Sequence, residues 1–311
     1  MRVAAIWLLA MYGGLAQAGA AERASELRAA GRFGEARDVA EQALAANPSD
    51  IALQNEEALA SERIALDAIA QHRPDDALGD LLRARKFAPE HPKLLFDLGV
   101  LEDEMKLYRD ADETLAHAER LQPADPQVLY AVARVKLDLG QLAVAEEKMR
   151  AYLVLKPEDA SAHYGLGRIY RQGLEFEKAR AEFERCIALQ PTQTEGYYQL
   201  GDTELQAGSY VEALANFDKT LQRQPKHGGA LAGSGIAYFK QKQYEQAMGF
   251  LQRAVQAAPD YQPGHYYLGL TLARMGRDAD SKKELEIASR LADEENRQSA
   301  NRLQLNGQAP E

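Results

Sequence analysis

Small and apolar residues recur along this chain at a fixed spacing of 34 residues. Prolines mark the period most clearly, at Pro89, Pro123, Pro157, Pro191, Pro225 and Pro259. Twelve residues before each proline stands an alanine: Ala77, Ala111, Ala145, Ala179, Ala213 and Ala247. Eight residues before each proline stands a large apolar residue: Leu81, Leu115, Met149, Phe183, Phe217 and Leu251. Self-similarity at such a period indicates a repeat architecture in which each repeat is one supersecondary unit.

A second pattern lies earlier in each repeat, as Leu98-Gly99, Val132-Ala133, Leu166-Gly167, Leu200-Gly201, Ser234-Gly235 and Leu268-Gly269. Because glycine has no side chain, a second helix can approach closely at this step. The alanine column allows the same closeness from the other side, and the large apolar residue four positions later fills the space between. Glycines such as Gly140 and Gly208 mark the turn, and the proline ends the second helix. The pattern predicts two helices of about 12–14 residues per repeat.

These columns resemble the tetratricopeptide repeat, whose signature is Leu-Gly, Tyr, Ala, Phe, Ala and Pro. The resemblance covers nearly all of the chain after its first twenty residues. It departs from the family where a tryptophan is frequent, since this chain has Leu95, Leu129, His163, Tyr197, Leu231 and His265 there. The resemblance implies an all-α fold, a right-handed α-solenoid of about eight helix-turn-helix repeats.

The eight expected repeats span about 17–50, 51–91, 92–125, 126–159, 160–193, 194–227, 228–261 and 262–295. The second is seven residues longer than the others. Since seven residues are two helical turns, we expect one long helix over 51–72. The eighth lacks the proline, and we expect its second helix to continue through Asn301-Arg302-Leu303 as the polar cap of a solenoid over 21–305. Residues 306–311 are expected to be disordered.

The first twenty residues, MRVAAIWLLAMYGGLAQAGA, differ from the repeats. Arg2 precedes an apolar run from Val3 to Leu15, and small residues follow at 16–18 and 18–20 in two A-x-A patterns. This is the layout of a secretory signal peptide over 1–20, cleaved after Ala18 or Ala20. The alternative is an uncleaved anchor, but the run is shorter than the roughly 20 residues that span a bilayer. We expect an exported protein, periplasmic or extracellular, without a membrane span after cleavage.

Composition narrows the range of partners. Hydrophobic residues make up 46% of the chain and charged residues 27%, as in ordinary folded proteins. The net charge of −10 argues against nucleic acid, whose phosphates require clustered Lys and Arg, and against anionic lipid. A single cysteine, Cys186, excludes an internal disulfide.

No catalytic constellation is found in the sequence, which has no H-E-x-x-H, C-x-x-C or P-loop motif. Gly165-Leu166-Gly167 resembles part of a nucleotide-binding turn, but no strand precedes it and Gly167 is the packing glycine of its repeat. The six histidines lack metal-ligand spacing, and Cys186 occupies a small-residue core column, which favours an inert buried thiol. We therefore expect no enzyme activity, no cofactor and no metal.

One face of the first helices combines aromatic and basic residues. Positions 27, 23 and 20 before each proline are i, i+4 and i+7 and share a face. In the middle repeats this face carries Tyr130, Arg134, Tyr164, Arg168, Arg171 and Tyr198. In the family that the chain resembles, this face lines the concave groove that holds partner peptides, and Tyr and Arg dominate interface energies. Packing between repeats is the alternative for the tyrosines, and pairing of Arg168 with Asp202 or Arg134 with Asp138 is the alternative for the arginines.

The sequence thus favours a non-catalytic scaffold or adaptor that binds a protein or peptide segment with acidic and apolar residues. A second hypothesis is an accessory component of an envelope export or assembly machine for polysaccharide, pili or outer-membrane proteins. Exported proteins of the family often serve in such machines. Partner identity and oligomeric state do not follow from the sequence.

Overall fold

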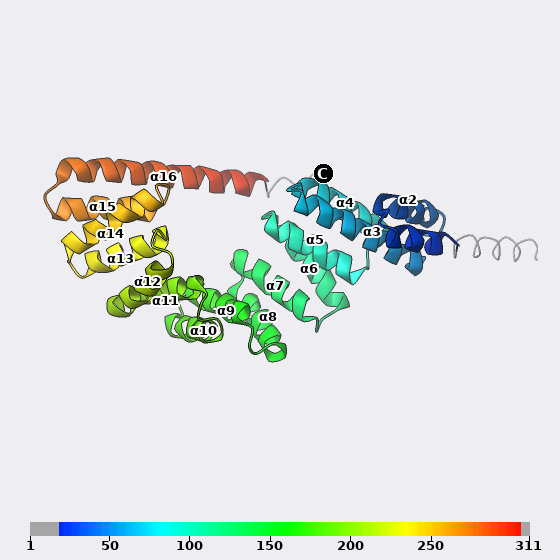
Figure 1. Cartoon of the computed structure of the whole chain (residues 1–311), viewed down its shortest axis with the longest axis horizontal. Coiled ribbons are helices and arrows are strands. Elements are labelled where there is room, and N and C mark those ends of the chain that lie inside the picture. The colour runs from blue at the N-terminus through cyan, green and yellow to red at the C-terminus, as the bar shows by residue number, and fades with distance from the viewer. Residues whose placement is uncertain (1–18, 306–311) are drawn as a thin grey trace, which may run out of the picture. The chain divides into compact units, whose positions relative to one another are not determined.

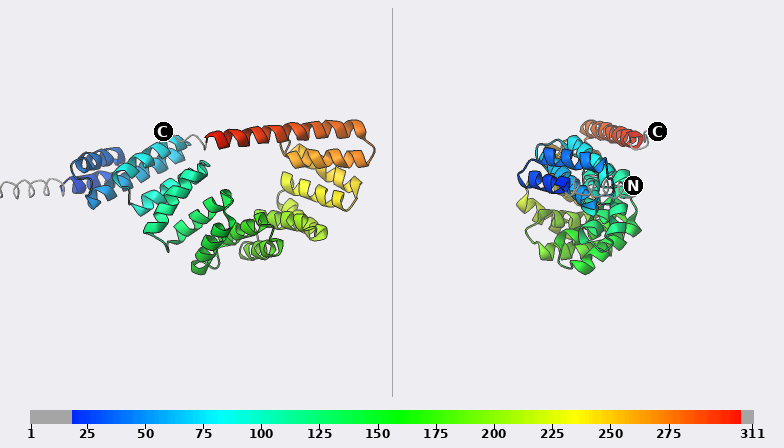
Figure 2. Two further views of the ribbon diagram at one scale, coloured as in Figure 1. Left: turned by 180° about the vertical axis from the view of Figure 1, so that it is seen from behind. Right: turned by 90° about the vertical axis from the view of Figure 1, so that its right-hand side faces the viewer.

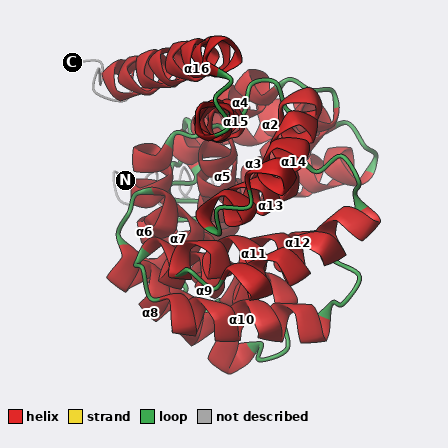
Figure 3. Cartoon of the chain, turned by 90° about the vertical axis from the view of Figure 1, so that its left-hand side faces the viewer, coloured by secondary structure: helices red, strands yellow, loops and turns green. Residues whose placement is uncertain are grey.

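The computed structural model describes residues 19–305, so the expectations for residues 1–18 and 306–311 lie outside the described part. Every regular element in residues 19–305 is a helix (Figures 1 and 3). Residues 19–29 are helical and precede the first labelled element. The labelled helices are α2 Phe33–Leu44, α3 Ile51–Ala70, α4 Pro74–Phe87, α5 Pro92–Glu104, α6 Tyr108–Leu121, α7 Pro126–Asp138, α8 Leu142–Leu155, α9 Ala160–Gln172, α10 Phe176–Leu189, α11 Thr194–Ala207, α12 Tyr210–Arg223, α13 Gly228–Lys240, α14 Tyr244–Ala257, α15 Gln262–Arg274 and α16 Asp278–Leu305. The predicted all-α solenoid class is confirmed.

The turn inside each repeat has the same backbone conformation throughout. Its central residue has a positive φ at Gly31, His72, Lys106, Gly140, Leu174, Gly208, Lys242 and Gly276. Glycine adopts this left-handed region without steric cost, whereas other residues do so only when the surrounding structure imposes it. The next helix begins two residues later in every case. The geometry of the repeat therefore imposes this turn conformation, even where its central residue is not glycine.

Several first helices begin with a side-chain cap. The carboxylates of Asp50, Asp125 and Asp159 accept hydrogen bonds from backbone N–H groups at the start of α3, α7 and α9. His91 and His227 do the same for α5 and α13 through Nδ1. These bonds satisfy N–H groups that have no partner inside the helix. Capping polar residues and the periodic prolines together fix where one repeat ends and the next begins.

The glycine column is the point of closest contact between the two helices of a repeat. A Cβ added at Gly167 would lie 2.7 Å from Cε1 of Phe183, and one at Gly99 would lie 2.5 Å from Cγ of Leu115. The same overlap occurs at Gly201 with Phe217, at Gly235 with Leu251 and at Gly269 with Leu285. In each pair the partner is the large apolar residue of the second helix. The predicted role of both columns is confirmed.

The helices form two compact units, α2–α7 and α8–α16, with the division between Gly140 and Gln141. The expected repeat 126–159 contributes α7 to the N-terminal unit and α8 to the C-terminal unit. In the N-terminal unit the core includes Ala77, Leu81 and Leu98, and in the C-terminal unit it includes Phe183 and Phe217. Within each unit consecutive helices pack side by side.

Two helices are longer than the repeat requires. Helix α3 has 20 residues and ends at Ala70, two residues before the predicted end, because Gln71 and His72 form the turn. Helix α16 has 28 residues, whereas its partner α15 has 13, and Figure 2 shows it running past the end of α15. It includes Asn301, Arg302 and Leu303, as expected for a helix that continues beyond the last repeat.

Two histidines replace a large packing residue by bonding at both ring nitrogens. His163 Nδ1 lies 2.6 Å from Glu182 and its Nε2 lies 3.0 Å from the carbonyl of Pro157. His265 repeats this geometry with Glu284 and the carbonyl of Pro259. Each ring joins the second helix of its repeat to the preceding connection. Hydrogen bonds at both nitrogens make a buried polar ring acceptable at this position.

Candidate partner-binding face

The six predicted site residues are distributed over both units. Helix α7 in the N-terminal unit carries Tyr130 and Arg134, whereas α9 and α11 in the C-terminal unit carry the others. Tyr164, Arg168 and Arg171 follow one another at i, i+4 and i+7 on α9, and Tyr198 lies on α11. The structure therefore brings four of the six residues together within one unit. We call Tyr164, Arg168, Arg171 and Tyr198 the α9–α11 face.

Tyr164 is half-buried and connects α9 to α10 and α11. Its ring lies edge-on to Phe183 of α10, with centroids 5.9 Å apart. Its hydroxyl lies 3.5 Å from Glu195 Oε1 on α11. Burial, followed by the Glu195 carboxylate, raises the pKa of the Tyr164 hydroxyl. The hydroxyl therefore remains a neutral hydrogen-bond donor.

Tyr198 packs against the next repeat. Its ring centroid lies 4.6 Å from that of His227 and 6.2 Å from that of Phe217. A Cβ at Gly229 would lie 2.6 Å from the Tyr198 hydroxyl, so this glycine makes room for the ring. Burial raises the pKa of Tyr198. These contacts support the packing interpretation for Tyr198, although the side chain keeps partial exposure.

The two arginines of α9 differ in their partners. Arg171 forms an ion pair with Asp202 of α11, and both side chains are 24% exposed. The suggested pairing of Asp202 with Arg168 is therefore wrong, because the guanidinium one turn farther along α9 takes the carboxylate. Arg168 is half-buried and forms no ion pair with any described residue. It is the basic group of this face with unused hydrogen-bonding capacity.

Arg134 in the N-terminal unit is also paired, but not with Asp138 of its own helix. Its Nη2 lies 2.8 Å from Oδ2 of Asp103 on α5. Asp103 is 5% exposed, and its burial raises the pKa of this carboxyl even though Arg134 acts in the opposite direction. The predicted cluster of three arginines therefore contains two guanidinium groups already engaged by carboxylates of neighbouring repeats.

Glu195 is a member of this region that sequence reasoning missed. It lies in the first turn of α11, where it accepts from Gln199 at 2.8 Å and faces both Tyr164 and His227. The available signal was its column, 30 residues before the proline, since equivalent first turns of adjacent repeats lie side by side. The carboxylate places a negative charge beside the Tyr164 hydroxyl.

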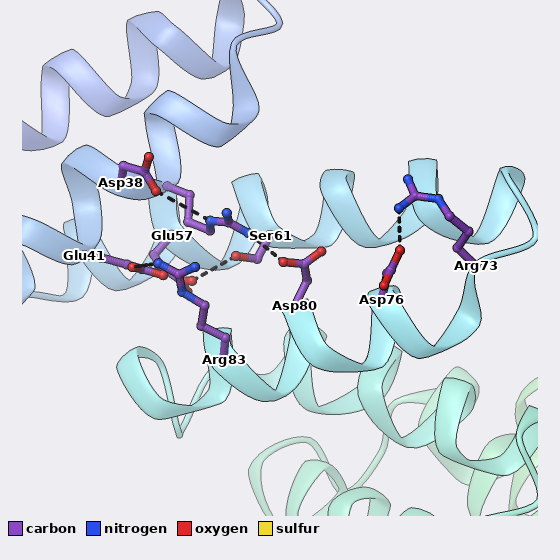
Figure 4. Close-up of polar contacts among 9 residues, drawn as sticks. Asp38, Glu41, Glu57, Ser61, Arg73, Asp76, Asp80 and Arg83 are labelled. Carbon is purple, nitrogen blue, oxygen red and sulfur yellow. Dashed lines mark hydrogen bonds and ion pairs between the residues drawn. The ribbon is translucent and has the colours of Figure 1, made fainter.

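A buried polar cluster lies in the N-terminal unit, among α2, α3 and α4 (Figure 4). Glu57 of α3 is fully buried and accepts from Ser61 at 2.9 Å. Burial is the main cause that raises the pKa of Glu57 to about 7. Arg37 and Arg83 nearby are paired with Asp80 and Glu41. Glu102 of α5 is similar, since burial raises the pKa of its carboxyl to about 7.

The described residues contain no group of three His, Cys, Asp or Glu side chains that could hold a metal ion. Cys186 is buried, and burial raises the pKa of its thiol, so the reactive thiolate is disfavoured. In residues 19–305 no helix combines the length and the apolar character that crossing a bilayer requires.

Comparison with protein families identifies the repeat. Two tetratricopeptide-repeat models match, one over residues 130–194 and one over residues 204–267. No curated relative matches the chain. The family is generally a non-catalytic protein-interaction fold.

Solved structures share the fold at low sequence identity. A tetratricopeptide repeat protein from Parabacteroides merdae is 17% identical and has a TM-score of 0.63, with 74% of this chain and 91% of that chain covered. Residues 41 to the end of MamA from Desulfovibrio magneticus RS-1 are 21% identical, with a TM-score of 0.51 and 55% and 96% covered. The Cut9–Hcn1 assembly of APC/C contains a chain 15% identical, with a TM-score of 0.61 and 86% and 52% covered. These likenesses show the fold alone.

Proposed function

We propose that this chain, a member of the tetratricopeptide-repeat family, is a non-catalytic scaffold that binds a protein or peptide segment on the α9–α11 face. The observation that carries the proposal is Arg168, a half-buried guanidinium with no ion-pair partner among the described residues. Tyr164, one turn earlier, adds an aromatic ring and a hydroxyl that stays neutral. Together they favour a segment with an acidic residue beside an apolar one.

The contacts within the C-terminal unit indicate which residues of the α9–α11 face are free to bind the partner. Arg171 and Tyr198 have partners within the unit, so they form the support of the face rather than its free groups. Arg168 is the residue expected to form a new ion pair with the partner. Tyr164 contacts Phe183 and Glu195 but stays partly exposed beside Arg168, so its ring is expected to contact the partner as well. We also propose that the protein is exported, which is supported by the signal-peptide layout of residues 1–20.

The experiment begins with capture of the partner in native cells. A photo-reactive amino acid in place of Gln172, which is exposed one turn after Arg168 on α9, leaves Arg168 intact and should crosslink a partner that the same group at position 154 does not, because Val154 is 81% exposed but lies on α8. Fluorescence anisotropy then measures the affinity of the captured segment. Tyr164→Ala combined with Arg168→Ala should weaken binding by more than about 1–2 kcal/mol, or roughly tenfold. Added salt should also weaken binding.

The matched control is Arg185→Ala, which removes an exposed cation from α10 in the same unit. It should leave the affinity unchanged. If the double variant lowers the melting temperature but spares the affinity per folded molecule, the face is a packing surface and the proposal fails.

A further inference from the structure

The N-terminal unit contains a cavity of about 240 Å³ between α3 and α5, which we call the α3–α5 groove. Its α3 wall is formed by Glu62, Ala65, Leu66 and Ile69, spaced i, i+3, i+4 and i+7 on one helical face. An apolar cavity of about 150 Å³ is already large enough to hold benzene. The groove therefore has room for a large side chain supplied from outside.

The opposite wall repeats the same spacing on α5 with Asp97, Val100, Leu101 and Glu104. Leu81 of α4 lies beneath the two walls and is 2% exposed. The groove is thus apolar in the middle and carboxylate-bearing at its ends.

Apolar side chains of this groove are left in contact with water. Leu66 is 49% exposed and Ile69 is 37% exposed. At equivalent steps elsewhere, side chains bridge the neighbouring first helices. Arg134 binds Asp103 between α7 and α5, Arg171 binds Asp202 between α9 and α11, and Phe239 contacts Tyr267 between α13 and α15 at 5.6 Å.

In the α3–α5 groove the bridge is confined to one end. Lys93 lies 2.7 Å from Glu62 and 3.0 Å from Asp97, which leaves Leu66 and Ile69 uncovered beyond it.

The charge of the groove selects the kind of partner. Three carboxylates, Glu62, Asp97 and Glu104, line it, and Lys93 is the cation that binds two of them. Glu62 and Asp97 are only 19% and 22% exposed, so water screens them weakly. Burial raises the pKa of Asp97 despite the hydrogen bond from Lys93, so this carboxyl would gain from a further cation.

We propose that the α3–α5 groove is a second docking site, which takes a protein segment carrying an aliphatic side chain flanked by Lys or Arg. The aliphatic side chain covers Leu66 and Ile69, and the basic groups meet Glu104 and the partly buried carboxylates. This site lies in the other unit and has the opposite charge preference from the α9–α11 face, so it does not rest on that proposed function. A chain with two such sites can hold two chemically different segments.

The test uses the full chain and two synthetic helical peptides, one built of Leu and Lys and the other of Leu and Glu. The Leu/Lys peptide should bind saturably and the Leu/Glu peptide should not. Leu66→Ser combined with Ile69→Ser should lower the affinity for the Leu/Lys peptide about tenfold or more, because the apolar contact is lost. Both side chains are substantially exposed, so the substitutions spare the core. Glu104→Lys should also lower the affinity for the Leu/Lys peptide, because it replaces a carboxylate of the groove with a cation.

Two controls separate this site from general attraction to an acidic protein. Val154→Ser removes an exposed apolar side chain from the C-terminal unit and should leave the affinity for the Leu/Lys peptide within about twofold of that of the wild type. Tyr164→Ala with Arg168→Ala should also leave it unchanged. Equal binding to wild type and the Leu66/Ile69 variant, a preference for Leu/Glu, or no saturable binding would each overturn the proposal. Self-association that the Leu66/Ile69 variant abolishes would overturn it too, because a second copy would then occupy the groove.

Discussion

Glu57 shows how one side chain can oppose the fold that contains it. Its carboxyl is fully buried on α3, Ser61 is its hydrogen-bond partner, and Oε2 has none among the described residues. Arg37 and Arg83 are committed to other carboxylates. The charged form is therefore poorly compensated, which explains why burial dominates its pKa.

This geometry predicts a pH-dependent effect of Glu57→Gln. Because the pKa of Glu57 is raised from 4.5 to about 7, the folded state binds its proton more tightly than the unfolded state. The unfavourable contribution of Glu57 is absent below about pH 4.5, grows as the pH rises to about 7, and is complete above that. Glutamine keeps an acceptor for Ser61 but carries no charge. Urea unfolding should show a gain of roughly 2–3 kcal/mol at about pH 8.5 and little gain at about pH 4.5.

The control for this prediction is Glu286→Gln, at a carboxylate that is 68% exposed on α16. It should change stability by less than about 0.5 kcal/mol at either pH. The same gain at both pH values for Glu57→Gln would mean that ionisation is not the cause.

At the scale of the element, the contact between two helices depends on the absence of one side chain. Gly167→Leu would place a large group where even a Cβ lies 2.7 Å from the Phe183 ring. We expect a loss of about 1–3 kcal/mol in the free energy of unfolding, which a urea titration monitored by circular dichroism would measure. Gly249→Leu is the matched control, because Gly249 is exposed within α14 and has no atom within 4 Å of an added Cβ. It should be neutral or stabilising, since leucine is the better helix former.

The helix pairs could be predicted because their information is local and repeated. The Gly and Phe or Leu columns describe one contact that recurs in five repeats, at Gly99, Gly167, Gly201, Gly235 and Gly269, so the copies reinforce one another. Arginine partners could not be predicted in the same way, since a long side chain can reach several positions on the next helix. Asp202 therefore takes Arg171 rather than Arg168, and Arg134 reaches α5 rather than Asp138. The tyrosine face and its partner remain predictions.

The division of the molecule left little signal in the sequence beyond Ala133, which stands in repeat 126–159 where five other repeats have glycine. Repeat 126–159 keeps Ala145, Met149 and Pro157 in register, and Gly140 resembles the other turn glycines. Nevertheless α7 and α8 belong to different compact units. The periodic positions of the sequence predict the contacts within each repeat. They do not predict where the array divides into units. The open α3–α5 groove was equally hidden, because it depends on which side chains bridge neighbouring repeats.

One prediction concerns the whole chain. If residues 1–20 are removed on export, Trp7 leaves with them, and Trp7 is the only tryptophan. Protein purified from the envelope fraction should then show tyrosine emission but no indole emission. Its intact mass should correspond to cleavage after Ala18 or Ala20. Protein made by translation in vitro without a membrane is the control that retains the indole signal. Indole emission at one tryptophan per chain from the envelope fraction would show that the segment is retained.

The recurrent left-handed turn makes this array easy to mark. Leu174 holds a φ of 59° while its side chain is 69% exposed, so it stabilises little by packing. Lys242 occupies the equivalent turn 68 residues later in the same unit. Because the native thiol of Cys186 is buried, a cysteine at either turn would be the accessible one. Fluorophores attached at these two turns would give fixed reference points within the C-terminal unit, from which the position of a bound segment can be measured.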